Sequence, residues 1–96
     1  MKLRFTPRAT RDLAEIADYL RNRNPAAAPA VRASIRSLQN LTLFPAIGRP
    51  QKVEGVRKLL TPKYRYLIYY AIEDEAEEIV ILTIQHPARR RAYRDV

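Results

Sequence analysis

The chain of 96 residues contains no cysteine, no tryptophan, one histidine and two glycines. Without cysteine it can form no disulfide and offers no thiolate nucleophile, and a reducing compartment such as the cytoplasm suits this composition. One histidine and no cysteine leave too few ligands for a structural zinc site, and no glycine-rich phosphate loop is present. We therefore expect neither a metal nor a cofactor.

Long apolar runs are also missing. The longest, from about Leu67 to Ile72, is far shorter than the roughly 20 residues that cross a bilayer. The N-terminal sequence MKLRFTPRATRDLAEI has arginine and aspartate where a signal peptide needs an apolar stretch. Hydrophobic residues make up 47% of the chain, which argues against disorder. We expect one cytoplasmic domain, residues 1–96, that does not enter a membrane.

Acidic residues are few outside one segment. The net charge is +8, yet residues 71–85 carry five acids and no base, so the remainder of the chain is strongly basic. Such a surface favours polyanions or an acidic protein partner. A general charge that keeps the protein in solution is the alternative interpretation.

Hydrophobic periodicity predicts a strand followed by two helices. Residues 2–6 alternate in polarity, and Thr6-Pro7 is typical of a helix start, with a hydroxyl cap before the proline. In the first helix, Arg8–Asp12 and Arg11–Glu15 fall on the expected solvent side as i,i+4 pairs. A second helix is expected from near Ala28. The apolar positions of the two helices are Leu13, Ile16, Ala17 and Leu20, then Ala28, Val31, Ile35, Leu38 and Thr42.

The second half of the chain predicts three strands. A turn at 47–50 precedes strands at 56–61, 64–72 and 78–85, and the polar residues 73–77 form a hairpin tip. The fold class is therefore α+β. We expect a small sheet of about four mostly antiparallel strands, with the N-terminal α-hairpin packed on one face, in the order β-α-α-β-β-β.

The last two strands are apolar on both faces. Tyr64, Tyr66, Ile68, Tyr70 and Ile72 alternate with Leu67, Tyr69 and Ala71, and Ile79, Ile81 and Thr83 alternate with Val80, Leu82 and Ile84. Two helices can cover only one face of a small sheet. The other face is therefore exposed or covered by a partner from outside the chain.

The order of these elements and five local sequences resemble the ParE/RelE superfamily of type II toxin–antitoxin toxins. The sequences are DLAEIADYL at 12–20, LTLFPAIGRP at 41–50, GVRKLL at 55–60, YRYLIYY at 64–70 and IVILTIQHPARR at 79–90. The resemblance implies a compact sheet with helices on one side. It also implies a cognate antitoxin with a segment that wraps the toxin, and thus a hetero-oligomeric complex.

The resemblance implies one of two activities. RelE-like members cleave mRNA on the ribosome, which requires proton transfer and stabilisation of a charged phosphorane. Lys52, Arg57, Arg89 and Tyr93 could loosely occupy such roles, although Lys52 is solitary where those ribonucleases have several lysines. ParE-like members instead inhibit DNA gyrase by binding and need no catalytic set. FPAIGR and His86 resemble this branch, which we favour, and a non-toxic or decayed binding module of the same fold is the third alternative.

The candidate contacts to a target or partner are basic and aromatic residues of the second half. They are Arg57, His86, Arg89, Arg90, Arg91, Tyr66 and Tyr70. His86 could instead be structural, the arginine run a solvated tail, and the tyrosines core residues. If Arg57 faces the helices, we expect it to pair with Glu15 or Asp18. Direct contact with nucleic acid, by stacking on tyrosine or through arginine, stays open.

Overall fold

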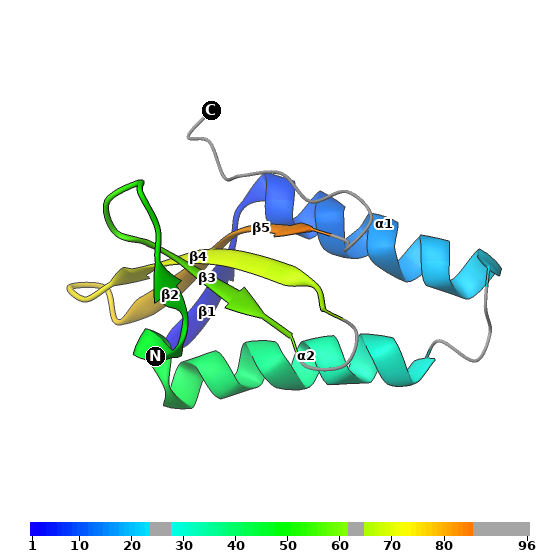
Figure 1. Ribbon diagram of the computed structural model, residues 1–96, viewed down its shortest axis with the longest axis horizontal. Helices are drawn as coiled ribbons and strands as arrows, with labels where there is room; N and C mark the ends of the chain where they lie inside the picture. The colour runs from blue at the N-terminus through cyan, green and yellow to red at the C-terminus, as the bar shows by residue number, and fades with distance from the viewer. Residues whose placement is uncertain (24–27, 62–64, 86–96) are drawn as a thin grey trace.

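The computed structural model describes residues 1–23, 28–61 and 65–85 (Figure 1). Strand β1 (Lys2–Phe5) leads into helices α1 (Pro7–Arg23) and α2 (Ala28–Leu43). A short 3-10 helix, η2 (Pro45–Ile47), and strands β2 (Arg49–Pro50), β3 (Val56–Leu60), β4 (Leu67–Glu73) and β5 (Glu78–Gln85) complete the described chain. The predicted α+β class, with two helices before the main strands, is confirmed.

The five strands form one sheet in the order β1-β5-β4-β3-β2. The first and last strands are parallel neighbours, and the other pairs are antiparallel. The sheet has one strand more than expected, because Arg49 and Pro50 pair with Lys58 and Arg57. Two residues that include a proline give no strand signal in a sequence, and proline is tolerated at a sheet edge.

The start of α1 follows from the residue that precedes it. The hydroxyl of Thr6 accepts a hydrogen bond from the Ala9 amide at 3.0 Å, and Pro7 takes the first helical position. The same hydroxyl donates to the Leu82 carbonyl oxygen at 2.8 Å. Thr6 therefore caps the helix and also ties it to β5.

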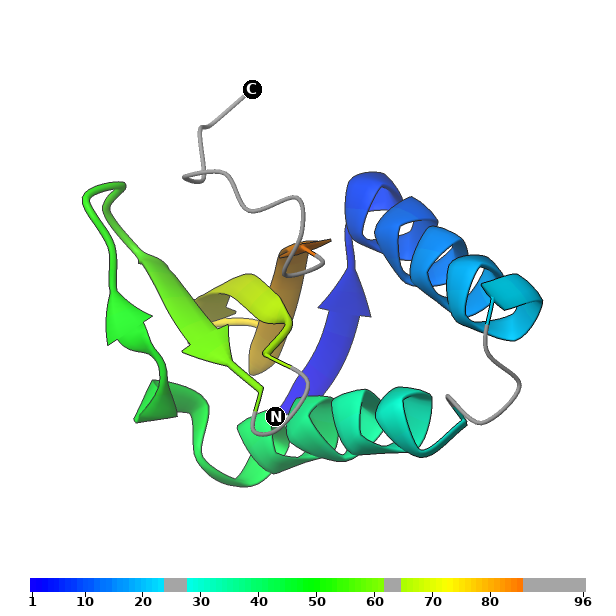
Figure 2. The same ribbon diagram turned by 45° about the vertical axis from the view of Figure 1, so that its right-hand side comes forward.

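The main core lies between the helices and one face of the sheet. α1 and α2 run in opposite directions along that face, and α1 packs mainly on β5 (Figures 1 and 2). The core side chains come from both helices, from β4 and the residue before it, and from β5. They are Ala9, Ile16, Leu38, Leu41, Tyr66, Ile68, Tyr70, Ile79, Ile81 and Ile84. No helix among the described residues is long and apolar enough to cross a membrane.

A register shift changes the predicted faces of β5. Tyr70 pairs with Ile81, but Tyr69 pairs with Thr83, so Leu82 is an extra residue in the ladder. One extra residue exchanges the two faces for all that follow it. Ile84 therefore joins the main core with Ile79 and Ile81, and Thr83 does not. The prediction that grouped Thr83 with Ile79 and Ile81 is wrong at this end of the strand.

The opposite face of the sheet carries a second, smaller cluster. Val56, Leu67 and Tyr69 form it, with Val53 and Leu82 packed against them. The alternation of β4 thus has apolar residues on both faces, as the sequence predicts. The prediction that a partner covers this second face stays a prediction.

Candidate functional site at the turn between α2 and β2

The residues predicted to carry function divide into two groups. Lys52, Arg57, Tyr66 and Tyr70 belong to the described part of the chain. His86, Arg89, Arg90, Arg91 and Tyr93 lie outside the described residues. The geometry of the site therefore rests on the first group, and its centre is the connection from α2 to β2.

Arg57 is fixed against this connection. It pairs with Tyr70 across β3 and β4, so the two side chains lie on the same side of the sheet. Its Nη1 atom donates to the carbonyl oxygens of Gly48 at 2.8 Å and Ala46 at 3.3 Å. These described hydrogen bonds go to backbone oxygens and not to the carboxylates of Glu15 or Asp18, which were the expected partners. Arg57 thus satisfies carbonyl groups at the end of a 3-10 turn.

Tyr70 holds the same turn from inside the core. Its ring is fully buried, and its hydroxyl accepts from the Gly48 amide at 2.8 Å and donates to the Pro45 carbonyl oxygen at 2.6 Å. Burial raises the pKa of Tyr70, while the Gly48 hydrogen bond and the positive charge of Arg57 act in the lowering direction. The pKa of Tyr70 stays above its ordinary value, and the hydroxyl, which is protonated at neutral pH, donates to Pro45.

Gly48 is the position at which the turn approaches the sheet. A Cβ atom there would lie 2.6 Å from the Tyr70 hydroxyl oxygen and 2.9 Å from the Lys58 carbonyl oxygen. Both distances are shorter than a carbon–oxygen contact allows. The glycine of the FPAIGR sequence is therefore required by close approach, and its backbone is extended with φ −75° and ψ 157°. We call residues 45–48 with Arg57 and Tyr70 the turn clamp.

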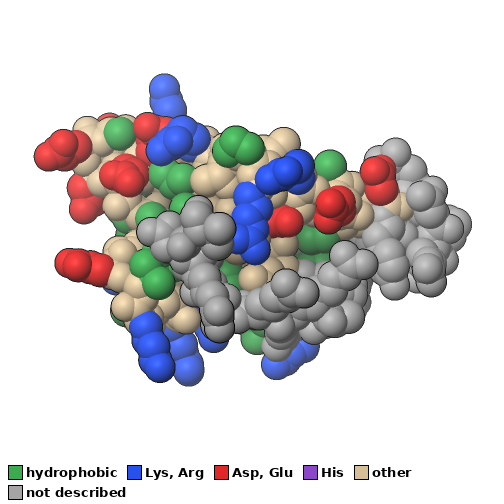
Figure 3. Space-filling view, turned by 90° about the horizontal axis from the view of Figure 1, so that it is seen from above, with side chains coloured by type: hydrophobic (Ala, Val, Ile, Leu, Met, Phe, Trp, Pro, Cys, Tyr) green, Lys and Arg blue, Asp and Glu red, His purple; other side chains and the backbone are tan. Residues whose placement is uncertain are grey.

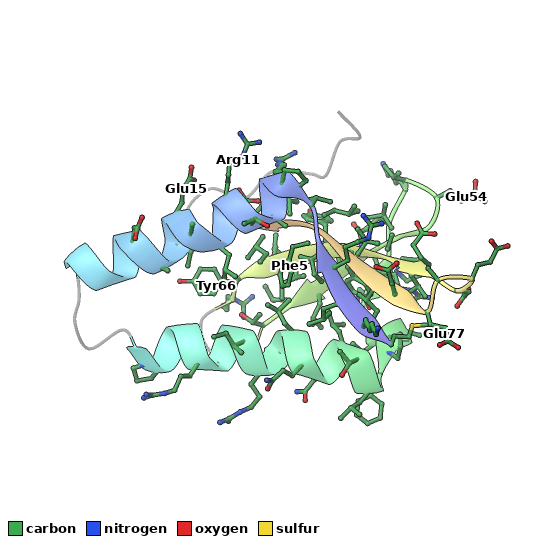
Figure 4. All side chains as sticks on the ribbon, turned by 180° about the vertical axis from the view of Figure 1, so that it is seen from behind. Phe5, Arg11, Glu15, Glu54, Tyr66 and Glu77 are labelled. Carbon is green, nitrogen blue, oxygen red and sulfur yellow. The ribbon has the colours of Figure 1, made fainter. Side chains whose placement is uncertain are left out.

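Lys52 and Tyr66 do not share this arrangement. Lys52 is exposed in the connection between β2 and β3. Tyr66 is 3% exposed and lies between the two helices (Figure 4). Because the rings of Tyr66 and Tyr70 are both in the core, neither offers its face to a partner in this conformation. Their contact with a partner stays a prediction.

A second group of polar contacts was not found from the sequence. The carboxylate of Asp12 accepts a hydrogen bond from the Thr83 hydroxyl and another from the Ile84 amide at 3.1 Å. Strand β1 ends at Phe5 opposite Ile81, and Asp12 supplies an acceptor to β5 beyond that point. The prediction that Asp12 pairs with Arg8 on the solvent side of the helix is therefore wrong. No sequence signal links residues so far apart. We call Thr6, Asp12 and Thr83 the helix anchor.

The surface around the turn clamp is apolar and exposed. Leu43, Phe44 and Ile47 are 71%, 62% and 57% exposed. Acidic side chains gather at the end of the molecule that holds the β4–β5 turn (Figure 3), which is also the end at which α2 finishes (Figure 1). Among the described residues no group of histidine and acidic side chains could hold a metal ion. The exposed side chains of Leu43, Phe44 and Ile47 offer a surface for binding. The polar groups of Arg57 and Tyr70 hold the backbone of residues 45–48 in position.

Comparison with known families agrees with this architecture. A family model described as the ParE toxin of the type II toxin–antitoxin system parDE matches residues 3–91. A protein of Sinorhizobium fredii (strain NBRC 101917 / NGR234), named "Putative toxin Y4kP", is 37% identical over 86 residues, which cover 88% of this chain and 86% of that protein.

Solved structures give the same result. The chromosomal ParDE system from P. aeruginosa contains a chain similar to this one with a TM-score of 0.74 and 28% identity, covering 90% of this chain and 95% of that one. The intact E. coli RelBE toxin–antitoxin complex contains a chain with a TM-score of 0.70 and 14% identity, covering 92% and 98%. The second likeness, at this identity, concerns the fold alone.

Proposed function

Because the chain belongs to the ParE toxin family of type II toxin–antitoxin systems, we propose that it inhibits DNA gyrase by binding. It acts in the cytoplasm, where its target is, and a cognate antitoxin neutralises it in a hetero-oligomeric complex. The P. aeruginosa ParDE structure, whose toxin-like chain is 28% identical to this one, is a toxin–antitoxin system, which supports the antitoxin as a partner.

The observation that carries the proposal is the place of Arg57. A catalytic arginine must aim its donors at the atoms on which charge develops. The Nη1 atom of Arg57 is hydrogen-bonded to the carbonyl oxygens of Ala46 and Gly48, so this part of the guanidinium is engaged within the chain. Its neighbour Tyr70 is buried with a raised pKa, so its hydroxyl is unsuited to act as a general base at neutral pH. This supports a protein that works by binding.

The basic composition supports an acidic partner. The net charge is +8, and a cognate antitoxin with acidic segments would be attracted to the toxin before contact. The cluster of Val56, Leu67 and Tyr69 on the sheet face opposite the helices is already buried within the chain, at 6%, 7% and 4% exposed, so it offers no free apolar surface to an antitoxin segment.

A supercoiling assay with purified gyrase tests the proposal. We expect the toxin to inhibit supercoiling at micromolar concentration, and prior addition of its antitoxin to restore it. Alanine at Arg89, Arg90 and Arg91 together should weaken inhibition more than alanine at Arg11, an outward residue of α1 (Figure 4). Full gyrase activity at micromolar toxin would count heavily against a gyrase inhibitor.

The same preparation separates the alternatives. Codon-linked cleavage of messages in a translating extract, lost in Arg57→Ala or Tyr93→Phe, would identify a RelE-like ribonuclease. Intact messages would exclude it. No growth arrest on expression without an antitoxin would identify a non-toxic or decayed module.

A further inference from the structure

We propose that Arg49 and Lys58, which lie side by side on the sheet face opposite the helices, contact the phosphate backbone of DNA. We call these two residues the cation pair. The proposal rests on the proposed function in its choice of DNA, because gyrase holds a DNA duplex. It adds a contact to the nucleic acid beside the contact to the enzyme.

The register of β2 and β3 places the two cations opposite each other. Arg49 is the partner of Lys58 in this antiparallel pair, and opposite residues have Cβ atoms about 5 Å apart on the same face. Val56 belongs to the second, smaller cluster, so Lys58, two residues further along β3, shares that face. Arg49 is exposed and Lys58 is partly exposed. Both charges are therefore on the side of the sheet away from the main core.

The backbone of Arg49 is fixed on both sides. Before it, the Gly48 carbonyl oxygen accepts a hydrogen bond from Arg57 at 2.8 Å. After it, the Gln51 amide donates to the Val56 carbonyl oxygen at 2.8 Å, and the Gln51 side chain donates to the Arg49 carbonyl oxygen at 2.9 Å. These bonds keep β2 paired with β3, so the two charges stay close together. A site that is ordered before contact loses less conformational entropy on binding.

The two members of the cation pair repel each other. Like charges at opposite positions of a ladder destabilise a sheet. Neither Arg49 nor Lys58 forms an ion pair with a carboxylate among the residues that the structure describes. A phosphate oxygen accepts strong hydrogen bonds from both arginine and lysine, so an anion beside the two cations would offset their repulsion. The arrangement thus favours binding of an anion.

The acidic residues of the described chain lie away from the cation pair. Those of α1 belong to the helical layer on the other face of the sheet (Figure 1). Glu73 shares a face with Tyr69, the partner of Lys58, but lies four residues further along β4, about 13 Å away. Glu54 is at the outer end of the connection between β2 and β3 (Figure 4). Because exposed charges are screened beyond about 8 Å at physiological salt, the acidic β4–β5 turn does not neutralise the pair.

The surface beside the cation pair is poor in exposed apolar side chains. Val56, Leu67 and Tyr69 on the same face are buried, and Leu60, at the end of β3, is 36% exposed. A protein segment gains most of its binding energy from apolar or aromatic anchors in pockets, whereas phosphate contacts need only well-placed donors. A second copy of the chain would also carry a charge of +8 and be repelled. The phosphate backbone of DNA fits these properties.

Salt-dependent binding of a short labelled DNA duplex, followed by fluorescence anisotropy with the purified toxin, tests the proposal. The logarithm of the association constant should fall linearly with the logarithm of the salt concentration. Arg49→Ala combined with Lys58→Ala should reduce this slope by about 1.8, because each phosphate contact contributes about 0.9. The reduction should be the same for duplexes of unrelated sequence, since phosphate contacts do not read the bases.

Two matched variants make the test specific. Arg8→Ala combined with Arg11→Ala removes two exposed cations from α1 and changes the net charge equally, yet it should reduce the slope by less than about 0.5. Arg49→Lys combined with Lys58→Arg exchanges the two cations and should retain the slope of the unaltered protein. Thermal melting checks that each variant is folded, which we expect because the four side chains are exposed or partly exposed.

Several results would overturn the proposal. An equal reduction of the slope in the α1 variant would assign binding to the general charge of the protein. Absence of DNA binding at low salt would exclude the contact, and tighter binding of an RNA duplex through the same pair would assign the pair to RNA. Full gyrase inhibition by the Arg49→Ala, Lys58→Ala variant would exclude the pair from the gyrase complex and leave the proposed function intact. Conversely, DNA binding through the pair by a toxin that does not inhibit gyrase would refute the proposed function and keep the DNA contact.

Discussion

The start of α1 and the exit of α2 are attached to the sheet in the same way but present different surfaces. At the start of α1, the helix anchor joins Thr6 and Asp12 to the backbone of β5. At the exit of α2, the turn clamp joins Tyr70 and Arg57 to the backbone of residues 45–48. In both places side chains form hydrogen bonds with backbone amide and carbonyl groups that have no partner in the sheet or helix ladders.

The difference lies in what surrounds each attachment. Beside the helix anchor, Ala9 and Ile16 are buried in the main core. Beside the turn clamp, Leu43, Phe44 and Ile47 are exposed. Polar bonding alone therefore does not mark a binding surface. The combination of a rigid backbone with exposed apolar side chains distinguishes the turn clamp, and the following variants test that distinction.

The largest effect is expected at Gly48. Gly48→Ala puts a Cβ atom 2.6 Å from the Tyr70 hydroxyl and 2.9 Å from a backbone oxygen, so the turn must move and lose its hydrogen bonds. We expect a loss of about 3 kcal/mol in the free energy of unfolding, measured by urea denaturation. Gly55→Ala is the control: its Cβ meets nothing within 4 Å, and its φ of +79° should cost about 1 kcal/mol. Equal losses would refute the role of close approach.

The next effect is at the helix anchor. Asp12→Ala removes the acceptor of the Thr83 hydroxyl and the Ile84 amide, and we expect a loss of about 2 kcal/mol. Glu15→Ala, on the outer side of the same helix (Figure 4), should change stability by less than about 0.5 kcal/mol. If both variants melt at the same temperature, Asp12 does not anchor the helix.

Tyr70→Phe removes the hydroxyl but keeps the ring, so it tests the contribution of the hydroxyl alone. The ring still fills the core, but the Gly48 amide and Pro45 carbonyl lose their partner, at a cost of about 1–2 kcal/mol. The pKa of Tyr70 is raised above 10.0 in the folded state, so its contribution is full below pH 10 and falls as pH rises through the higher folded value. The stability difference between the two proteins should therefore shrink above pH 10. A constant difference would contradict a raised pKa.

The smallest effect on stability is expected at Phe44, the exposed residue that follows α2. Phe44 is 62% exposed, so Phe44→Ser should change the free energy of unfolding by less than about 0.5 kcal/mol. Thermal melting of Phe44→Ser and of Tyr70→Phe compares the stability lost at an exposed residue of the turn with that lost at a buried residue that holds the turn. A large loss of stability in Phe44→Ser would show that Phe44 supports the fold and is not free for a partner.

Much of the fold could be predicted because its signals are local. The start of α1 at Thr6-Pro7, the start of α2 at Ala28 and the apolar alternation of β4 all agree with the structure. Strand β2 was not predicted because a strand of two residues is too short to show an alternation of polar and apolar positions. The faces at the end of β5 were exchanged because a bulge at Leu82 depends on the partner strand.

The site could be predicted only in part. The sequence selected Arg57 and Tyr70, but as contacts to a partner or target. Their hydrogen-bond partners are backbone groups in a turn 9 to 25 residues earlier in the chain. Leu43 and Phe44 follow the predicted apolar stripe of the second helix, which ends at Thr42, and nothing in that stripe shows that they are exposed.

By itself the sequence determined the class of fold, the order of the helices and main strands, the superfamily resemblance and the separation of an acidic segment from a basic remainder. Periodicity, capping residues and charge act between near neighbours, and they can be read along the chain. The tertiary structure decided that Asp12 reaches β5 across 71 positions, that Tyr70 and Arg57 hold one turn, and that Gly48 has no room for a side chain. These contacts depend on how strands and helices meet in space, which no local pattern specifies.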